Sequence, residues 1–219
     1  MKFSLFRSVA AAAFAVTAFT ASAQIINATF TFDSVSSGTN ANTFATPQIS
    51  FHEAHYVPFT DSFGDPISGS DHWEVDTASD LLNPVTVENP SNYGRGSAPS
   101  PTNALQALWQ PVLVSFDRPY LLNAFSTVLD NDPYGFTEKI AFITSTGISS
   151  ELWIDQTTPG YVAGASNRGE ITGIVLPSGA FYDDLSISLV AVPEPSTYGL
   201  IAVGLCLGLV GLKRIRSRK

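Results

Sequence analysis

Hydrophobic and polar residues alternate with a period of two along the middle of this 219-residue chain. Successive side chains of a β-strand point to opposite faces of the sheet, so this alternation predicts strands. The same region has no hydrophobic stripe of period 3.6 that is long enough for a helix. The sequence therefore predicts a nearly all-β domain, built as an antiparallel β-sandwich. The alternating runs are residues 26–32, 112–116, 121–129, 139–144, 151–156, 170–176 and 184–190.

Turn residues separate these runs, as an antiparallel sheet requires. Residues 130–135 read Asp-Asn-Asp-Pro-Tyr-Gly, and residues 158–160 read Thr-Pro-Gly. Inside the run at 121–129, alternation predicts that one face carries Leu121, Phe125, Thr127 and Leu129. The domain has three tryptophans that could form a binding platform or belong to the core: Trp73, Trp109 and Trp153. Large aromatic side chains dominate protein cores, so we expect each of them in the core, and exposure on one sheet face or loop would favour polysaccharide binding.

Two segments of the predicted sheet resemble extracellular jelly-roll modules of the galactose-binding or carbohydrate-binding kind. They are residues 112–126 (Val-Leu-Val-Ser-Phe-Asp-Arg-Pro-Tyr-Leu-Leu-Asn-Ala-Phe-Ser) and residues 181–187 (Phe-Tyr-Asp-Asp-Leu-Ser-Ile). The resemblance implies a jelly-roll-like sandwich. Because one fold hosts many unrelated functions, it implies much less about the ligand.

The N-terminus has the three parts of a secretory signal peptide, predicted to cover residues 1–23. Lys2 and Arg7 supply positive charge, and the apolar stretch from Val9 to Phe19 is too short to span a bilayer comfortably. A signal peptidase is expected to cut the chain just before Gln24. Ala21 and Ala23 supply the small side chains that its binding pocket must accommodate. The alternative is a short N-terminal anchor that stays uncut.

The C-terminus carries three different signals in a fixed order over residues 192–219. Val192 is followed by Pro193, Glu194 and Pro195, where the prolines disfavour helix. An uncharged, mostly apolar stretch runs from Tyr198 to Leu212 and contains Gly204 and Gly208. As a helix its 15 residues would be about 22 Å long, which is short for a membrane span. The basic end comprises Lys213, Arg214, Arg216, Arg218 and Lys219.

Together these parts resemble the PEP-CTERM sorting signal. The resemblance implies that an exosortase, a membrane-embedded enzyme, recognises the tail and cuts it near the Pro-Glu-Pro motif. It also implies a Gram-negative bacterium that makes exopolysaccharide. The basic end is expected to remain cytoplasmic while the rest of the chain lies across the inner membrane, before release to the cell surface or extracellular matrix. The alternative is an ordinary membrane-anchored structural surface protein whose single span stays in place.

Charge and cysteine content limit what the central domain, residues 24–192, can do. It has four basic and 18 acidic residues, a net charge of −14, so binding to nucleic acid is disfavoured. The chain's one cysteine, Cys206, lies in the apolar tail. The domain is therefore predicted to be stable without disulfides, although its exported environment permits them.

Several side chains in the domain are candidates for ligand or metal binding. Tyr93 and Arg95, in an irregular segment at 83–103, could stack on and hydrogen-bond to a sugar, or Tyr93 could simply pin an ordered loop. His52 and His55 lack the spacing of a helical zinc site and would point to opposite faces of a strand. A structural calcium ion is a better candidate than zinc, because oxygen ligands from acidic loops suit a hard cation. The resemblance to jelly-roll modules implies ligands near the first and last strands, which here are Asp33 and either Asp183 or Asp184.

These features predict an exported, non-catalytic surface or matrix protein that requires no cofactor and binds polysaccharide. The expected partners are signal peptidase and the secretion machinery, the inner membrane, the exosortase and exopolysaccharide. The alternative from another class is a secreted carbohydrate-active hydrolase, which would need two carboxyl groups facing each other across a cleft.

Overall fold

The computed structural model describes residues 24–57, 72–75, 84–95, 103–130, 137–158 and 160–192. Residues 25–191 form one compact unit. The predicted signal peptide, the sorting tail from Pro193 to Lys219 and most of the turn at 130–135 lie outside the described residues. Within the residues that the structure describes, no helix is both long and apolar enough to cross a membrane.

The described residues of the unit form strands and two short 3₁₀ helices. In chain order the elements are β1 (Ile25–Phe30), β2 (Thr39–Asn40), η1 (Ala41–Phe44), β3 (Ile49–Val57), β4 (His72–Val75), β5 (Thr86–Glu88), η2 (Pro90–Tyr93), β6 (Ala104–Ala107), β7 (Val112–Leu129), β8 (Thr137–Thr144), β9 (Gly147–Asp155), β10 (Val162–Leu176) and β11 (Ala180–Ala191).

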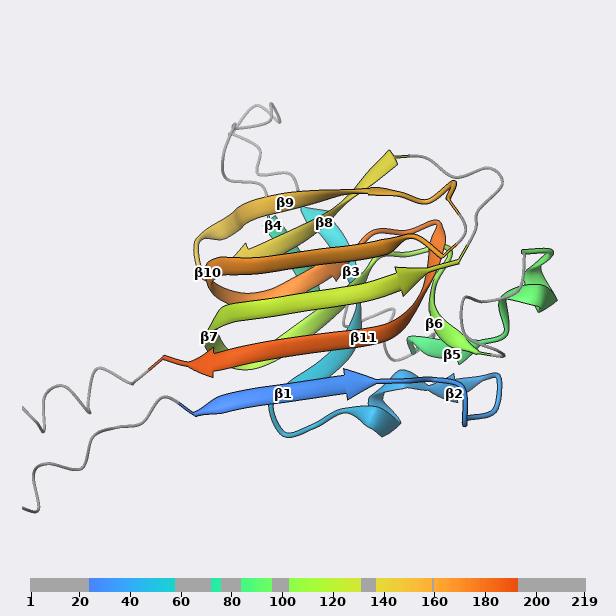
Figure 1. Cartoon of the computed structure of the whole chain (residues 1–219), viewed down its shortest axis with the longest axis horizontal. Helices are drawn as coiled ribbons and strands as arrows, with labels where there is room; N and C mark the ends of the chain where they lie inside the picture. The colour runs from blue at the N-terminus through green and yellow to red at the C-terminus, as the bar shows by residue number, and fades with distance from the viewer. Residues whose placement is uncertain are drawn as a thin grey trace, which may run out of the picture. The chain divides into compact units, whose positions relative to one another are not determined.

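All pairings between these strands are antiparallel, which confirms the predicted all-β antiparallel class. The strand order is β2-β5-β6-β11-β7-β10-β8-β9, with β1 beside β11 and β3 beside both β7 and β4 (Figure 1). The last strand, β11, is therefore central. It pairs with β7 on one side and with β1 and β6 on the other.

Two long strands let the sheet fold back on itself. The first part of β7 pairs with β3, and the later part pairs with β11. β10 pairs with both parts of β7, and its register shifts between Ile171 and Gly173. Figure 1 shows β3 and β8 behind β7, β10 and β11. Phe30 of β1 thus packs edge-on against Phe51 of β3, with ring centroids 5.1 Å apart, although these strands are not paired.

Part of the sheet is buried on both faces. The main core contains large buried side chains such as Tyr120, Phe51 and Phe142. A second, smaller cluster lies on the other face, where Trp73 and Val75 of β4 pack on it; its buried members are Ala54, Leu113, Ala141, Ile143 and Val175. The second cluster explains why residues 112–114, 140–143 and 174–176 are apolar at every position, a departure from the alternation predicted for the runs that contain them.

A β-bulge corrects one predicted face. Phe125, Thr127 and Leu129 are buried together as expected, but Leu121 is 44% exposed and Leu122 is 1% exposed. Ser188 of β11 pairs with residue 124 of β7, and the next residue, Leu189, pairs with Leu122. One extra residue in β7 therefore shifts the alternation, and the prediction for Leu121 is wrong.

A buried tyrosine anchors the turn between β10 and β11. Tyr182 is fully buried, and its hydroxyl donates to the Pro177 carbonyl at 2.8 Å. The turn is closed by Gly179, at φ 96°, and the buried Gln156 side chain donates to the Ser178 carbonyl at 3.2 Å. Burial disfavours the phenolate, so the pKa of Tyr182 lies well above its ordinary value of 10.0.

We predict that the domain loses stability as pH rises above about 10. The unfolded chain releases the Tyr182 proton near pH 10, whereas the native state keeps it, so the free energy of unfolding falls by up to about 1.4 kcal/mol per pH unit for this group. Urea denaturation between about pH 8 and pH 11 measures the slope. Tyr182→Phe should cost about 1 kcal/mol at neutral pH and make the alkaline decline shallower. An unchanged slope in Tyr182→Phe would contradict this assignment.

Candidate functional site

The tryptophans do not all lie where the sequence suggests. Trp73 is half-buried on the second cluster, but Trp109 is 75% exposed and Trp153 is 58% exposed. The core prediction is therefore wrong for Trp109 and Trp153. Trp153 alternates outward from β9, whose neighbouring residues Leu152 and Ile154 face the main core.

Trp109 lies in the short connection between β6 and β7, and both ends of this connection are fixed. The Gly179 amide donates to the carbonyl of Ala107 at 2.8 Å, and the Ala54 amide donates to the carbonyl of Pro111 at 3.0 Å. Side chains in a fixed connection on a rigid sheet are commonly used for binding. The exposed indole is thus presented by a well-anchored backbone.

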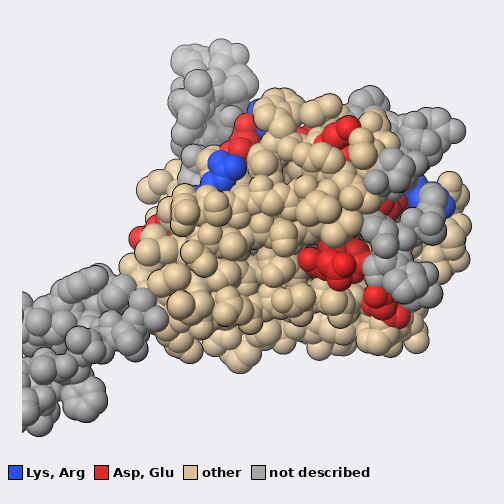
Figure 2. Space-filling model, viewed as in Figure 1, with Lys and Arg blue, Asp and Glu red and all other residues tan. Residues whose placement is uncertain are grey.

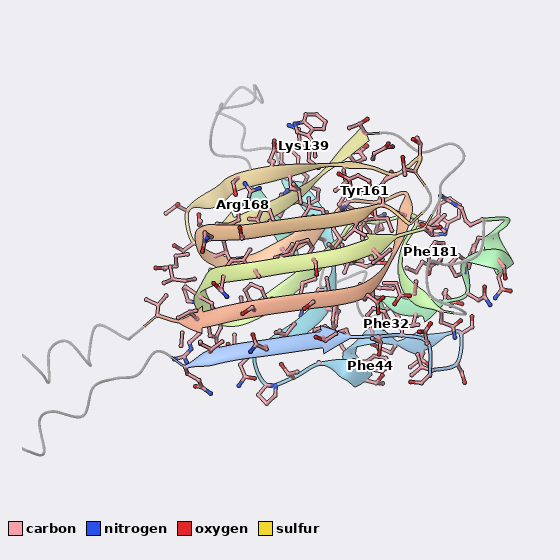
Figure 3. The ribbon with its side chains drawn as sticks, in the orientation of Figure 1. Phe32, Phe44, Lys139, Tyr161, Arg168 and Phe181 are labelled. Atoms are coloured by element: carbon pink, nitrogen blue, oxygen red, sulfur yellow. The ribbon has the colours of Figure 1, made fainter. Side chains whose placement is uncertain are left out.

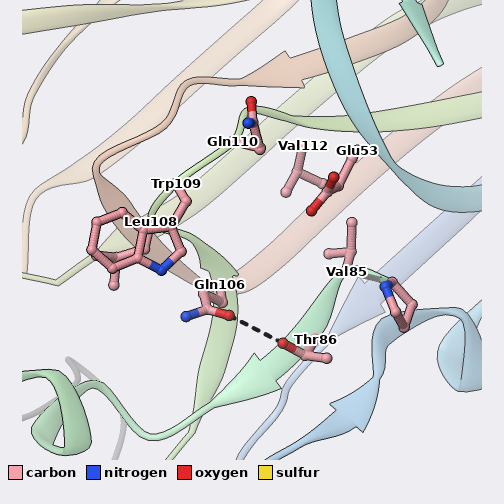
Figure 4. A pocket seen from close by; sticks show the side chains of 9 residues that line it. Glu53, Val85, Thr86, Gln106, Leu108, Trp109, Gln110 and Val112 are labelled. Atoms are coloured by element: carbon pink, nitrogen blue, oxygen red, sulfur yellow. Dashed lines mark hydrogen bonds between the residues drawn. The ribbon is translucent and has the colours of Figure 1, made fainter. Parts of the chain in front are cut away.

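A small hollow adjoins Trp109 (Figure 4). Its volume is about 40 Å³, which suits water molecules and is too small for a sugar ring. Four polar side chains line it together with Trp109, and they come from β3, β5, β6 and the β6–β7 connection: Glu53, Thr86, Gln106 and Gln110. The Thr86 hydroxyl donates to Oε1 of Gln106 at 3.1 Å. We call Trp109 and these four residues the Trp109 site.

The Trp109 site combines groups suited to binding a polar ligand across a surface. An indole presents a flat apolar face, while amide, hydroxyl and carboxylate groups supply hydrogen-bond donors and acceptors. Because the hollow itself is water-sized, a ligand would lie across the indole rather than inside a cavity. The arrangement can therefore bind a ring that has both an apolar face and hydroxyl groups.

Tyr93, from the predicted ligand loop, lies on the same face of the sheet as Gln106. Gln106 of β6 pairs with Phe181 of β11, and directly paired residues point to the same side. The Tyr93 ring packs on Phe181 with centroids 5.7 Å apart and is still 40% exposed. Tyr93 therefore packs its backbone segment against the sheet and keeps part of its ring accessible to a ligand.

The backbone around Tyr93 is fixed by two local devices. The Asn89 side chain caps η2 by accepting from the Ser91 amide at 2.9 Å. Gly94 ends η2 at φ 70°, which lets the Arg95 amide donate to the Pro90 carbonyl at 3.3 Å. Arg95 itself is half-buried.

Trp153 has a different environment from Trp109. The ammonium of Lys139 lies 4.5 Å from the centroid of the Trp153 ring and also forms a 2.5 Å ion pair with Glu151. Lys139 projects near the upper edge of the sheet in Figure 3. A cation–π contact of this kind already occupies one face of the indole. Trp153 is therefore less suited than Trp109 to stacking on a ligand.

Comparison with known proteins identifies no relative whose function could be assigned to this chain. No protein-family model, curated protein or solved structure matches the chain.

The predicted calcium ligands have different exposures. Asp183 is buried and its carboxylate accepts from the Asp184 amide at 2.8 Å, whereas Asp184 is exposed, at φ 46°. Asp33 is half-buried just beyond β1. Among the described residues, no group of three or more His, Cys, Asp or Glu is arranged to hold a metal ion.

The histidines predicted not to bind zinc lie on a strand, as expected. Both His52 and His55 belong to β3. Nε2 of His52 lies 2.8 Å from the Ser50 hydroxyl, and His55 is exposed. The histidine pair thus has the strand context that argued against a helical zinc site.

Proposed function

We propose that this chain is an exported, non-catalytic protein of the cell surface or extracellular matrix that is sorted through its C-terminal tail and binds polysaccharide. The order of parts in the tail supports the sorting. Signal peptidase would make Gln24 the new N-terminus. The apolar stretch would then hold the chain briefly in the inner membrane, with Lys219 in the cytoplasm. An exosortase would finally cut the chain near Glu194.

The exposed indole of Trp109 beside four polar side chains is the observation that carries the proposed binding. Acidic proteins repel polyanions, so a neutral or only weakly charged polysaccharide suits a domain of net charge −14. Glu53 is the carboxylate among the residues that line the hollow, whereas glycoside hydrolysis uses two facing carboxyl groups. This composition favours binding over hydrolysis.

We further assign the domain to the jelly-roll-like β-sandwiches. Support comes from the antiparallel sheet that folds back on itself and from the contact between Phe30 and Phe51. In such an architecture, connections between strands at the end of the sandwich commonly carry binding residues, as Trp109 would.

Substituting Trp109 tests the proposed binding. A well-placed aromatic anchor contributes about 1.5 kcal/mol or more, so Trp109→Ala should weaken polysaccharide binding about tenfold or more. Residues 24–192 would be applied to a glycan array, and the bound glycans titrated by calorimetry. Trp153→Ala is the matched control and should bind within about twofold of the parent. If the parent binds no glycan, or if only Trp153→Ala loses binding, the proposal is wrong.

Structural calcium at Asp33, Asp183 and Asp184 stays a prediction and has a separate test. If calcium binds the native state only, millimolar calcium will raise the melting temperature by mass action. Asp183→Asn would abolish this increase. Thermal melting with calcium and then with a chelator makes the measurement, and an identical melting temperature in both rules the ion out.

A further inference from the structure

Three of the sheet's edges carry protection against pairing with another chain. An unpaired edge strand offers free amide and carbonyl groups, and natural proteins shorten, bend, charge or cover it. β2 has only two residues. β9 has a register shift opposite residues 142–143 and carries Glu151.

The edge of β3 is closed by an asparagine side chain. Oδ1 of Asn42 accepts from the Phe51 amide at 2.8 Å, and its Nδ2 donates to the Phe51 carbonyl at 2.6 Å. The amide of Asn42 therefore replaces one residue of a neighbouring strand and satisfies both backbone groups of Phe51.

β1 has none of these devices. Its six residues, Ile-Ile-Asn-Ala-Thr-Phe, contain no charge and no proline, and they pair with β11 in unbroken register. Among the described strands, β11 is its one sheet neighbour. An open groove of about 530 Å³ follows β1 from Ile26 to Thr31, and its opposite wall is Phe44, Thr46 and Gln48. In Figure 2 the surface where β1 runs is uncharged.

We propose that the free edge of β1 pairs antiparallel with β1 of a second copy of this chain. No charged side chain lines the groove, so the groove has no group that would form an ion pair with a charged partner. Two copies of a domain with net charge −14 repel each other, and an uncharged edge is where they can approach closely. A second β1 brings an equally uncharged, β-prone strand, so the pairing suits both partners.

Two-fold symmetry restricts the register of this pairing. The symmetry axis stands perpendicular to the sheet, so residues opposite each other must share a face. Asn27 and Thr29 are exposed, whereas Ala28 and Phe30 alternate toward the inside. The axis therefore passes through a residue, and the two centres that pair the most residues of β1 are Asn27, which then faces itself, and Ala28, which places Asn27 opposite Thr29.

Disulfide trapping tests the pairing in the full chain. Cys206→Ser removes the chain's one cysteine. In that background we introduce Asn27→Cys alone and Asn27→Cys/Thr29→Cys together. Residues that face each other across the axis have Cα atoms about 4.5–5.5 Å apart, which is within the range of a disulfide. Mild oxidation in detergent should give a reducible dimer from the double variant in either register, and from Asn27→Cys alone if Asn27 faces itself. Ser145→Cys, in the exposed β8–β9 turn, is the control and should stay monomeric.

Sedimentation of the full chain without added cysteines gives a second readout. Asn27→Asp/Thr29→Asp places carboxylates opposite each other in both registers and should convert dimer to monomer, whereas Ser145→Asp/Thr146→Asp should not. No dimer in either experiment, equal dimer from the Ser145 control, or a cross-link to a different protein would overturn the proposal. None of these outcomes bears on glycan binding at Trp109.

Discussion

Deleting β11, residues 180–191, is expected to abolish folding of the domain. β11 is central in the sheet, and its removal would leave β1 and β6 without their pairing to the rest of the sheet. It would also remove buried side chains from the main core, including Tyr182, Leu185, Ile187 and Leu189. Burying one large apolar side chain contributes about 1.5–3 kcal/mol, while whole domains are stable by about 5–15 kcal/mol. The loss therefore exceeds the margin of stability.

Circular dichroism and urea denaturation of two truncations make this measurement. The chain 24–192 should unfold cooperatively, because it retains the whole compact unit 25–191. The chain 24–179 should show neither a cooperative transition nor near-ultraviolet dichroism. A cooperative transition in the shorter chain would show that β11 is dispensable and would refute the central position given to it.

Replacing Leu122 by alanine is expected to destabilise the domain far more than the same change at Leu121. Leu122 is 1% exposed, so Leu122→Ala removes core contacts and leaves a cavity, at a cost of about 2–5 kcal/mol. Leu121 is 44% exposed, so Leu121→Ala should lower the free energy of unfolding by less than about 1 kcal/mol. The two variants are matched in chemistry and adjacent in sequence.

Urea denaturation of both variants of the chain 24–192 compares their free energies of unfolding. The bulge in β7 predicts the large effect at Leu122. Regular alternation, which the sequence alone favours, would place Leu121 beside Phe125 in the core. A larger loss at Leu121 would therefore show that β7 lacks the bulge.

The strands of this domain were predictable because local alternation records which face is buried. Runs such as 26–32 and 184–190 correspond to β1 and β11. The exceptions have physical causes that are not local. The bulge in β7 is defined by its partner β11, and residues 140–143 are buried on both faces because β4 packs on a second cluster.

The candidate site was harder to predict than the fold. Tyr93 was found because it lies in an irregular segment rich in glycine and proline. Trp109 is one of three candidate tryptophans in the sequence, but it is expected in the core because it lies between two apolar runs. The local signal was Pro111, which marks Leu108–Gln110 as a connection rather than strand. The polar groups of the Trp109 site come from segments far apart in the chain, and only the fold brings Glu53 near Gln106.

The distribution of basic residues and the positions of the first and last strands fit the proposed removal of both chain ends. Seven of the 11 basic residues lie in the predicted signal peptide and tail. Ile25 pairs with Val190, so the first and last strands of the compact unit begin and end side by side. Cleavage before Gln24 and after Val192 would leave every described strand intact.

Intact-mass spectrometry of the form recovered from the surface of exporting cells determines whether both ends of the chain are removed. We expect a chain that begins at Gln24 and ends between Val192 and Tyr198, without the apolar stretch and the basic end. A surface-associated chain that retains Lys219 would show that the tail is not processed.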